Sequence, residues 1–236
     1  MDNKFLRTEG LIGKDGLEKL KNSKVAVFGI GGVGSYSLEA LARSGVGTIY
    51  IYDNDTVSSS NINRQLIADI TTVGKFKTEV AASRTRLINP DINIIENPIF
   101  VTHETPINFK DFDFIIDAID NVTAKLYLIC EAKKADVPLI SVMGTGNKLD
   151  PSRLKISDIY KTDTCPLARV MRLELKKRGI KNQDVIWSDE IPVKSSYTED
   201  FKGGSRPAPA SMSFVPGAAG LLAASAAVKT IIENNK

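Results

Sequence analysis

A cluster of glycines near the start of the chain has the composition and spacing of a phosphate-binding turn. The apolar run VAVF at residues 25–28 leads into the pattern G-x-G-x-x-G with one extra glycine, formed by Gly29, Gly31, Gly32 and Gly34. Such a turn needs glycine for a tight bend, for close approach of the backbone to phosphate, and for packing of helix on strand. The helix expected at residues 35–44 would point its N-terminus at the phosphate. A plain strand-to-helix turn is the alternative, and the pattern does not say which nucleotide binds.

An acidic residue follows at the position where a dinucleotide fold binds ribose. The segment TIYIYD at residues 48–53 is rich in β-branched and aromatic residues, which predicts a second strand ending in Asp53. Asp53 lies 19 residues beyond Gly34, the spacing at which a carboxylate accepts hydrogen bonds from ribose hydroxyls. A dehydrogenase fits these features as well as an ATP-binding enzyme does.

Cationic side chains after that strand favour a triphosphate. Arg64 lies in the polar segment NINRQ at residues 61–65, and Lys75 and Lys77 precede or open a helix predicted at residues 77–88. A nicotinamide cofactor carries one pyrophosphate, which the glycine turn largely satisfies, whereas a triphosphate needs further cationic donors. A solvated helix face is the alternative for one lysine alone, but the combination with Arg64 favours phosphate binding.

A carboxylate near the end of another predicted strand is a candidate metal ligand. Residues 112–118, FDFIIDA, predict the strand, and Asp120 follows it. Because the carboxyl ends of parallel strands face the ligand crevice, Asp120 is expected to hold Mg²⁺ on phosphate oxygens. Capping of the next helix, which starts near Asn121, is the competing use of this carboxylate.

These residues can form one site only if the strands before them belong to one sheet and have their carboxyl ends at the same edge. Further strands are predicted within residues 93–101, where Pro98 suggests an edge position or a break in the strand, and at residues 138–143. Strands and helices alternate, so the expected fold class is α/β: a Rossmann-like, mostly parallel sheet with helices on both faces. The 236 residues are expected to form a single domain, with a nucleotide-binding core at 24–150 and a C-terminal, substrate-side extension at 151–236.

The extension has candidate features of its own. Residues 154–158 predict a short strand, and residues 194–210 have the composition of a mobile loop. A helix is expected to begin at Pro166, with an apolar stripe formed by Leu167, Val170, Met171 and Leu175, and with a basic stripe formed by Arg169, Arg172 and Lys176. The net charge is +5 over residues 151–236 and −2 over 1–150, which permits a polyanionic partner.

Cysteine content and apolar segments bound the remaining possibilities. Two cysteines, Cys130 and Cys165, are too few for a disulfide framework or a four-thiolate zinc site. Cys165 precedes a helix, where a thiol could take up an acyl group, although packing is the favoured role. Charged residues interrupt the start of the chain, and the apolar segment 215–228 is short and rich in Gly and Ala. We therefore expect a cytoplasmic protein without a membrane span, in which a core helix ends the fold.

Taken together, the motifs resemble those of the ubiquitin-activating-enzyme-like superfamily, whose members adenylate a carboxylate with ATP. The resemblance rests on the glycine turn at 29–34, Asp53-x-Asp55, Asn61-x-x-Arg64-Gln65, Lys77 and Asp117-x-x-Asp120-Asn121. Within the superfamily the chain is most similar to the tRNA threonylcarbamoyladenosine dehydratases, on the further motifs Phe5-x-Arg7-Thr8, ARSGVG at 42–47, Asp53-Asn54-Asp55-Thr56-Val57, Asn89-Pro90 and Leu149-Asp150-Pro151.

The resemblance implies ATP and Mg²⁺ as cofactors and tRNA as the partner. The carboxylate of threonylcarbamoyladenosine would attack the α-phosphate of ATP and expel pyrophosphate. The carbamoyl part of the same side chain would then close a ring and release AMP. Arg64, Lys77 and Asp120 would be catalytic, with Asp120 on the metal and Arg7 supplied by the other subunit of a homodimer. The nucleotide site would comprise Gly29, Gly31, Gly32, Gly34, Asp53, Asp55, Asn61, Asn63, Arg64, Lys77, Asp120 and Asn121.

Two other functions stay open. Activation of a small ubiquitin-like sulfur carrier is the second, and it would need a partner with a flexible Gly-Gly tail. Relatives of that branch often carry paired Cys-x-x-Cys zinc ligands, which this sequence lacks, so the dehydratase is favoured. A sulfur-carrier or cysteine-desulfurase-type partner remains possible beside the tRNA. A non-catalytic nucleotide-binding adaptor is the third function.

Overall fold

A computed structural model describes residues 4–196, 198–201, 204–207 and 209–234 of the chain. Its centre is a seven-stranded sheet in the order β3-β2-β1-β4-β5-β7-β6, in which β6 runs antiparallel to β7 and the other neighbours are parallel. The strands are β1 (Lys24–Phe28), β2 (Thr48–Tyr52), β3 (Asn93–Asn97), β4 (Phe114–Asp117), β5 (Leu139–Val142), β6 (Leu154–Asp158) and β7 (Asp184–Ser188). The expected α/β class with a mostly parallel sheet is confirmed.

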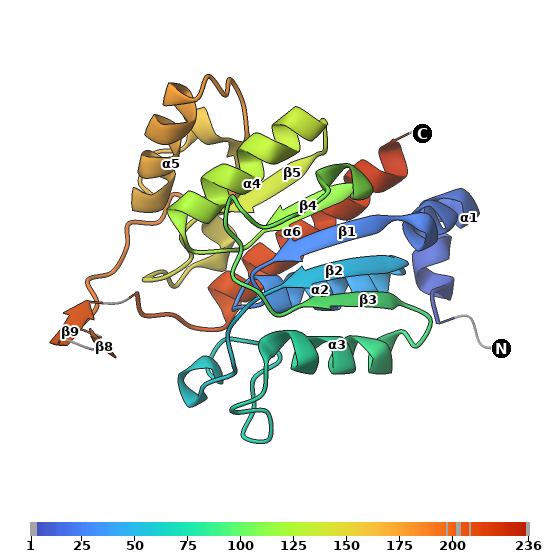
Figure 1. The fold of residues 1–236 in the computed structure, drawn as a ribbon, viewed down its shortest axis with the longest axis horizontal. Helices are drawn as coiled ribbons and strands as arrows, with labels where there is room; N and C mark the ends of the chain where they lie inside the picture. Colours follow the sequence, from blue (N-terminus) through green and yellow to red (C-terminus); the bar gives the residue numbers. More distant parts are fainter. Residues whose placement is uncertain (1–3, 197, 202–203, 208, 235–236) are drawn as a thin grey trace.

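Helices cover both faces of the sheet, as expected (Figure 1). One apolar core joins the sheet to α2, α3 and α6, and a second core joins its other face to α4 and α5. The helices are α1 (Leu6–Asn22), α2 (Gly34–Ser44), α3 (Lys77–Ile88), α4 (Val122–Ala135), α5 (Pro166–Lys177) and α6 (Phe214–Glu233), and the 3₁₀ turns are η1 (Ser59–Asn61), η2 (Phe109–Asp111), η3 (Pro151–Arg153) and η4 (Ile159–Lys161).

The strand order reverses between β1 and β4, and this reversal locates the ligand crevice. From β1 the chain winds outward through β2 to β3, whereas β4 and β5 lie on the other side of β1. In open parallel sheets the ligand lies beyond the carboxyl ends of the strands where the order reverses. Residues 25–28 of β1 are fully buried, so the strand is a fixed support for the glycine turn that follows it.

Two expectations about strands have different outcomes. β3 is an edge strand, as Pro98 predicted. β7 was missed, since no strand was predicted after residue 158, although its apolar core Val185, Ile186 and Trp187 is the usual sequence signal of a strand. β7 lies between β5 and β6, so residues 151–236 extend the sheet that the first 150 residues begin.

Residues 194–210, expected to form a mobile loop, contain two short strands between the segments 194–196 and 209–210, which have no regular secondary structure. β8 (Thr198–Phe201) and β9 (Gly204–Pro207) form a two-stranded antiparallel hairpin that projects from the body of the molecule (Figure 1). Tyr197, Lys202, Gly203 and Ala208 of the predicted loop lie outside the described residues.

The last helix is a core element. α6 is long and apolar enough to cross a membrane by length and composition, but half of that apolar window is buried in the protein. It packs closely on α2, since a Cβ added at Gly220 would lie 2.3 Å from the backbone oxygen of Val33. The small residues therefore permit helix-on-helix contact, as the sequence predicted.

Candidate active site

The glycine turn has the tight backbone conformation that its sequence indicates. Gly29 adopts a left-handed conformation, with φ of 85°. A Cβ at Gly34 would lie 1.8 Å from the backbone oxygen of Gly29, so any side chain there would force the turn apart. Gly31 and Gly32 expose their backbone to the crevice instead. The turn is thus compatible only with glycine at its ends and leaves room for a ligand between them.

A first cavity of about 470 Å³ opens beside this turn, at the carboxyl ends of β1, β2 and β4. Ten of the residues predicted for the nucleotide site line it: Gly29, Gly31, Gly32, Asp53, Asp55, Asn61, Arg64, Lys77, Asp120 and Asn121. Gly34 lies behind the turn, and Asn63 lines a neighbouring cavity described below. The structure therefore brings together side chains from positions 29 to 121 around one space.

Asp53 is held in one orientation by its neighbours. One carboxylate oxygen accepts a hydrogen bond from the backbone N–H of Ile30 at 2.6 Å, and the other accepts one from Asp55 at 2.9 Å. Burial raises the pKa of Asp53, although the Lys77 ammonium, 3.9 Å away, acts to lower it. A fixed, buried carboxylate beside a phosphate turn is suited to accept hydrogen bonds from ribose.

Lys77 is almost completely buried, at 6% exposure, although it begins α3. Its ammonium lies 2.7 Å from the Asp55 carboxylate, which itself is mostly exposed at the mouth of the cavity. A solvated helix face is therefore excluded for Lys77. Lys75, two residues earlier, is exposed and does not line the cavity.

Arg64 and Asn61 belong to a compact polar turn. The Arg64 guanidinium donates to the backbone oxygen of Ser60 and to the side-chain oxygen of Asn63, at 2.9 and 3.0 Å. The Asn61 side chain accepts from the backbone N–H of Ser58, which closes the capping box of η1. Both hydrogen-bond partners of the Arg64 guanidinium are neutral groups, so its positive charge stays available to an anion.

The competition between capping and metal binding at Asp120 is resolved by its neighbour. Asn121 is the N-cap of α4 and accepts from the backbone N–H of Ala124 at 3.0 Å, so capping by Asp120 is wrong. Asp120 is exposed and lines the first cavity, and no hydrogen bond or ion pair to it occurs within the described residues. Its carboxylate oxygens are accessible to a ligand.

A buried ion pair beneath the crevice was not anticipated from the sequence. Lys125 and Asp117 are both fully buried, with the ammonium 3.0 Å from the carboxylate. Lys125 also donates to the backbone oxygen of Val142, and Ser141 donates to Asp117. These contacts tie the ends of β4 and β5 together directly before the residues that line the crevice. The helical sequence around Lys125 has ordinary amphipathic spacing and gave no sign that this lysine would be buried in an ion pair.

Gln65 was quoted as part of a motif but was not expected to contact the ligand. It lines the first cavity at 6% exposure, and its oxygen is the one buried side-chain polar atom without a hydrogen-bond partner in the described part of the chain. An unpaired buried acceptor is costly. A hydroxyl group of a bound ligand, or a water molecule bound with it, would donate a hydrogen bond to this oxygen.

A second cavity of about 780 Å³ adjoins the first. The two cavities share a wall formed by Val33, Asn61, Arg64, Ala118, Ile119, Asp120, Thr145 and Ser211. The second cavity continues away from the glycine turn, along Met143 and Gly144 after β5 to Leu167 on α5, and to residues 209–211. Its polar side chains are supplied by Ser58, Ser60, Asn61, Asn63, Arg64, Asp120, Thr145 and Ser211.

Cys165 and Arg7 do not line either cavity. The Cys165 thiol is buried, with 1% exposure, and packs against Gly144 from below the cavity wall. This position supports packing as its role. Arg7 is exposed on α1, which lies at the end of the sheet opposite to the carboxyl ends of β1 and β2 (Figure 1).

The two stripes expected on α5 are only partly correct. The buried face is formed by Ala168, Met171 and Leu175, whereas Val170 is 43% exposed. Arg169 and Lys176 are exposed, but Arg172 donates to the backbone and side-chain oxygens of Thr162 and so connects α5 to η4. The predicted basic stripe therefore contains two free cations rather than three.

A nucleotide-binding α/β fold with a phosphate turn and a second, adjoining cavity defines the class of this protein. Residues 5–236 match the model of the ThiF family, and the chain belongs to that family. It is 47% identical over 233 residues to the tRNA threonylcarbamoyladenosine dehydratase of Bacillus subtilis, with 94% of this chain and 92% of that protein covered. The protein of the same name from Haemophilus influenzae is 42% identical over 165 residues, covering 69% of this chain and 63% of its own.

Solved structures give the same relationship. The crystal structure of Escherichia coli tRNA N6-threonylcarbamoyladenosine dehydratase in complex with ATP matches with a TM-score of 0.85 and 33% identity, covering 97% of this chain and 93% of that one. The similarity therefore includes the whole sheet and the extension, and not only the glycine turn.

Proposed function

We propose that this protein uses ATP to adenylate the carboxylate of threonylcarbamoyladenosine in tRNA and then cyclises that side chain. One observation carries the proposal: a nucleotide-sized cavity beside a phosphate turn shares a wall with a second cavity, and Arg64 and Asp120 stand in that wall. A substrate carboxylate in the second cavity would meet the α-phosphate of ATP at the shared wall. The similarity to proteins named for this reaction, over nearly the whole chain, supports it.

ATP would lie in the first cavity with its ribose toward Asp53 and its phosphates toward the turn and Lys77. The ammonium of Lys77 would be a strong donor to phosphate oxygens, because it is charged and because its burial lowers the dielectric screening around it. Arg64 would neutralise charge on the phosphates at the side where pyrophosphate leaves.

The donor set around Asp120 fits Mg²⁺ in the form that nucleotide sites use. Magnesium is held by one or two carboxylates together with phosphate oxygens and water. No group of three or more acidic, histidine or cysteine side chains that could hold a metal occurs within the described residues. Asp120 would therefore act as the protein ligand of a magnesium ion that the triphosphate brings with it. When bound, the ion lowers the charge repulsion between the triphosphate and the approaching carboxylate.

The second step needs no protein nucleophile. No cysteine, histidine or lysine occurs among the residues that line the second cavity, all of which are described. An acyl-adenylate formed there would be attacked by the carbamoyl group of the same side chain, and the ring closure would expel AMP. Such an intramolecular attack has a large proximity advantage. This also disfavours the acyl-carrier route through Cys165, which is buried below the wall.

We further propose that the enzyme is a homodimer in which Arg7 of one subunit serves the triphosphate of the other. Arg7 is exposed, and it does not line the cavities of its own chain. An exposed arginine at the far end of the sheet can contact ATP only if a second copy brings its own crevice to it.

One experiment compares the tRNA reaction with the activation of a sulfur carrier. Purified protein with ATP and Mg²⁺ is supplied either with tRNA that carries threonylcarbamoyladenosine or with a small carrier protein ending in Gly-Gly. We expect pyrophosphate and AMP with the tRNA alone, together with the cyclic nucleoside in the digested tRNA by mass spectrometry. Pyrophosphate release with the carrier alone would favour activation of a sulfur carrier over the tRNA reaction. Release with neither substrate would favour a non-catalytic nucleotide-binding adaptor.

A further inference from the structure

The wall of the second cavity contains a short segment that has no regular secondary structure. We call residues 209–211 the strap. Pro209, Ala210 and Ser211 all line the second cavity, and Ser211 also lines the first. The strap follows the β8–β9 hairpin and leads into α6, so without specific contacts it would move with the hairpin. Because Ser211 lines both cavities, the strap forms one side of their junction.

Asn147 holds the strap by a two-way contact. Its backbone N–H donates to the backbone oxygen of Ala210, and its side-chain oxygen accepts from the backbone N–H of Ala210, both at 2.7 Å. The backbone oxygen of Asn147 also accepts from Val193, at 2.8 Å, which lies before the hairpin. One residue therefore fastens both chain segments that lead to the hairpin.

The backbone of Asn147 is adapted to this contact. It adopts a left-handed conformation, with φ of 59°, which is uncommon outside glycine but which asparagine tolerates. Gly146, the preceding residue, allows the strap to lie close, because a Cβ there would stand 2.6 Å from the Cβ of Pro209. At the other end of the strap, the Asn63 side chain donates to the backbone oxygen of Ser211 at 2.9 Å.

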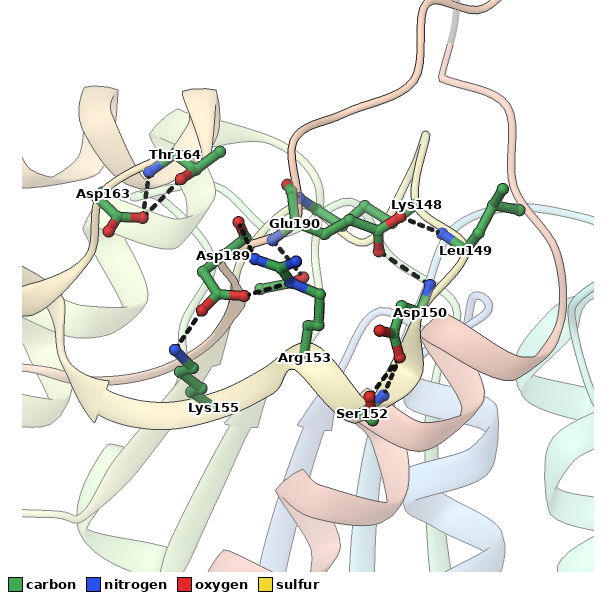
Figure 2. Close-up of polar contacts among 11 residues, drawn as sticks. Lys148, Leu149, Asp150, Ser152, Arg153, Lys155, Asp163, Thr164, Asp189 and Glu190 are labelled. Carbon is green, nitrogen blue, oxygen red and sulfur yellow. Dashed lines mark hydrogen bonds and ion pairs between the residues drawn. The ribbon is translucent and has the colours of Figure 1, made fainter.

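The support beneath Asn147 is rigid. Figure 2 shows the carboxylate of Glu190 accepting from the backbone N–H groups of Leu149 and Asp150, at 2.8 and 2.9 Å. Lys148, at 3% exposure, donates to the backbone oxygen of Glu190 at 2.9 Å. Asp189 beside it pairs with Arg153 and Lys155. The residues that follow Asn147 are thus fixed to the end of β7, and the strap is fastened to them.

We propose that Asn147 is a positioning residue that keeps the strap closed against the acyl-adenylate and so excludes water from it. The inference rests on the proposed function. An acyl-adenylate has two fates at this junction. Ring closure by the carbamoyl group gives product, whereas attack of water on the acyl carbon breaks its bond to the phosphate oxygen. In the second case AMP leaves, a proton is released, and the original carboxylate is regenerated.

The strap therefore sets the ratio of AMP formed to cyclic product formed. When water is excluded, one AMP accompanies each ring. When the strap loosens, ATP is consumed without cyclisation, and the ratio rises. A residue with a merely structural role would lower both products together and leave their ratio unchanged, so the ratio is specific to water exclusion.

The test compares Asn147→Gly with Asn147→Asp in the full-length protein. Glycine accepts the left-handed backbone but removes the side-chain acceptor for Ala210, whereas aspartate keeps an acceptor oxygen. We expect a ratio of AMP to cyclic nucleoside that is several-fold higher in Asn147→Gly and near the wild-type value in Asn147→Asp. In water enriched in ¹⁸O, the open nucleoside recovered from the glycine variant should carry label in its carboxylate. Incubation of the purified cyclic tRNA without ATP controls for hydrolysis of the product.

The outcomes separate this inference from the function on which it rests. Wild-type protein that forms no AMP with the tRNA would contradict the proposed function itself. AMP formation by Asn147→Gly with an unchanged ratio and no label would overturn the role of the strap alone. If Asn147→Gly does not fold, Gly146→Ala provides the second variant, because its added methyl group displaces Pro209 from the other side. An unchanged ratio in that variant would also overturn the inference.

Discussion

Most of the nucleotide wall of the site comes from residues 29–124, whereas the opposite wall of the second cavity comes from residues 142–146, Leu167 and residues 209–211. In the first wall, the turn and the side chains that follow β2 and β4 line the cavity directly. In the second wall, the backbone of residues 210 and 211 is held by the side chains of Asn147 and Asn63, which lie far away in the chain. The nucleotide half therefore depends on particular side chains, and the substrate half depends on the position of the backbone.

Gly34→Ala should give the largest effect and tests how narrowly the nucleotide wall is defined. The added Cβ would lie 1.8 Å from the Gly29 oxygen, so the turn must open. We expect ATP binding to be lost in isothermal titration and the free energy of unfolding to fall by about 3 kcal/mol in urea. The control is Gly10→Ala on the exposed part of α1, where nothing lies within 4 Å, and there we expect unchanged binding.

Asp120→Asn and Asn121→Ala divide metal binding from helix capping at adjacent positions. Loss of the Asp120 charge should lower kcat by about 100-fold and raise the Mg²⁺ concentration required for half-maximal rate. Its melting temperature should stay the same, because the carboxylate has no partner among the described residues. Asn121→Ala should instead destabilise the protein by about 1 kcal/mol through loss of the α4 cap, with an unchanged Mg²⁺ requirement. An unchanged Mg²⁺ requirement in Asp120→Asn, with a higher requirement in Asn121→Ala, would contradict Asp120 as the metal ligand.

Lys77→Met tests the charge that the nucleotide wall contributes. Removal of a charged donor to phosphate costs about 1.5–3 kcal/mol, so ATP should bind about 10- to 100-fold more weakly. Lys75→Met is the matched control, because that side chain is exposed and outside the cavity. Equal losses in both variants would contradict a specific phosphate contact.

The pH dependence of ATP binding tests whether Asp53 and Lys77 act together in the nucleotide wall. Burial raises the pKa of Asp53, and Lys77 is one of the groups that act to lower it. If ribose binding needs the ionised carboxylate, affinity falls as the pH drops through the pKa of Asp53. Without Lys77 that pKa rises further, so the acid limb of binding should move to higher pH in Lys77→Met. An unmoved acid limb would show that Asp53 does not titrate in this process.

Arg7→Ala tests whether a second copy completes the nucleotide wall. Each of Arg7→Ala and Lys77→Ala should be weakly active alone. In a mixed dimer, the subunit that retains Lys77 receives Arg7 from its partner, so one of the two sites is complete. Co-expressed, differently tagged variants should therefore recover activity above that of either parent. Activity that stays at the level of the parents, with dimers confirmed by sedimentation, would contradict the shared site.

The difference between the two walls also explains what the sequence could predict. Gly29, Asp53 and Asp120 each follow a strand that is visible as an apolar run, and their spacing along the chain therefore predicts where they lie in the fold. Lys125 and Asn147 act through contacts with residues that lie 8 and 63 positions away, and ordinary helix or loop composition gives no sign of them. β7 differs from these residues, because its apolar run could have predicted a strand, and only its position between β5 and β6 is set by tertiary pairing.

The smallest expected effect concerns tRNA docking outside both walls. Arg169 and Lys176 are exposed on α5 and are seven positions apart, two turns along the helix. If they neutralise tRNA phosphates, replacing both with Glu should raise the KM for tRNA a few-fold and reduce the slope of log K against log salt by about 1.5, with ATP affinity unchanged. Lys14 and Lys21 are exposed with the same spacing on α1, and replacing both with Glu should leave the slope as it was. Arg172→Glu should act differently, since its loss breaks the contacts with Thr162 and destabilises the protein by about 1–2 kcal/mol. An equal change in slope for the α1 and α5 pairs would mean that net charge alone attracts the tRNA, and the surface of α5 would then have no special role in docking.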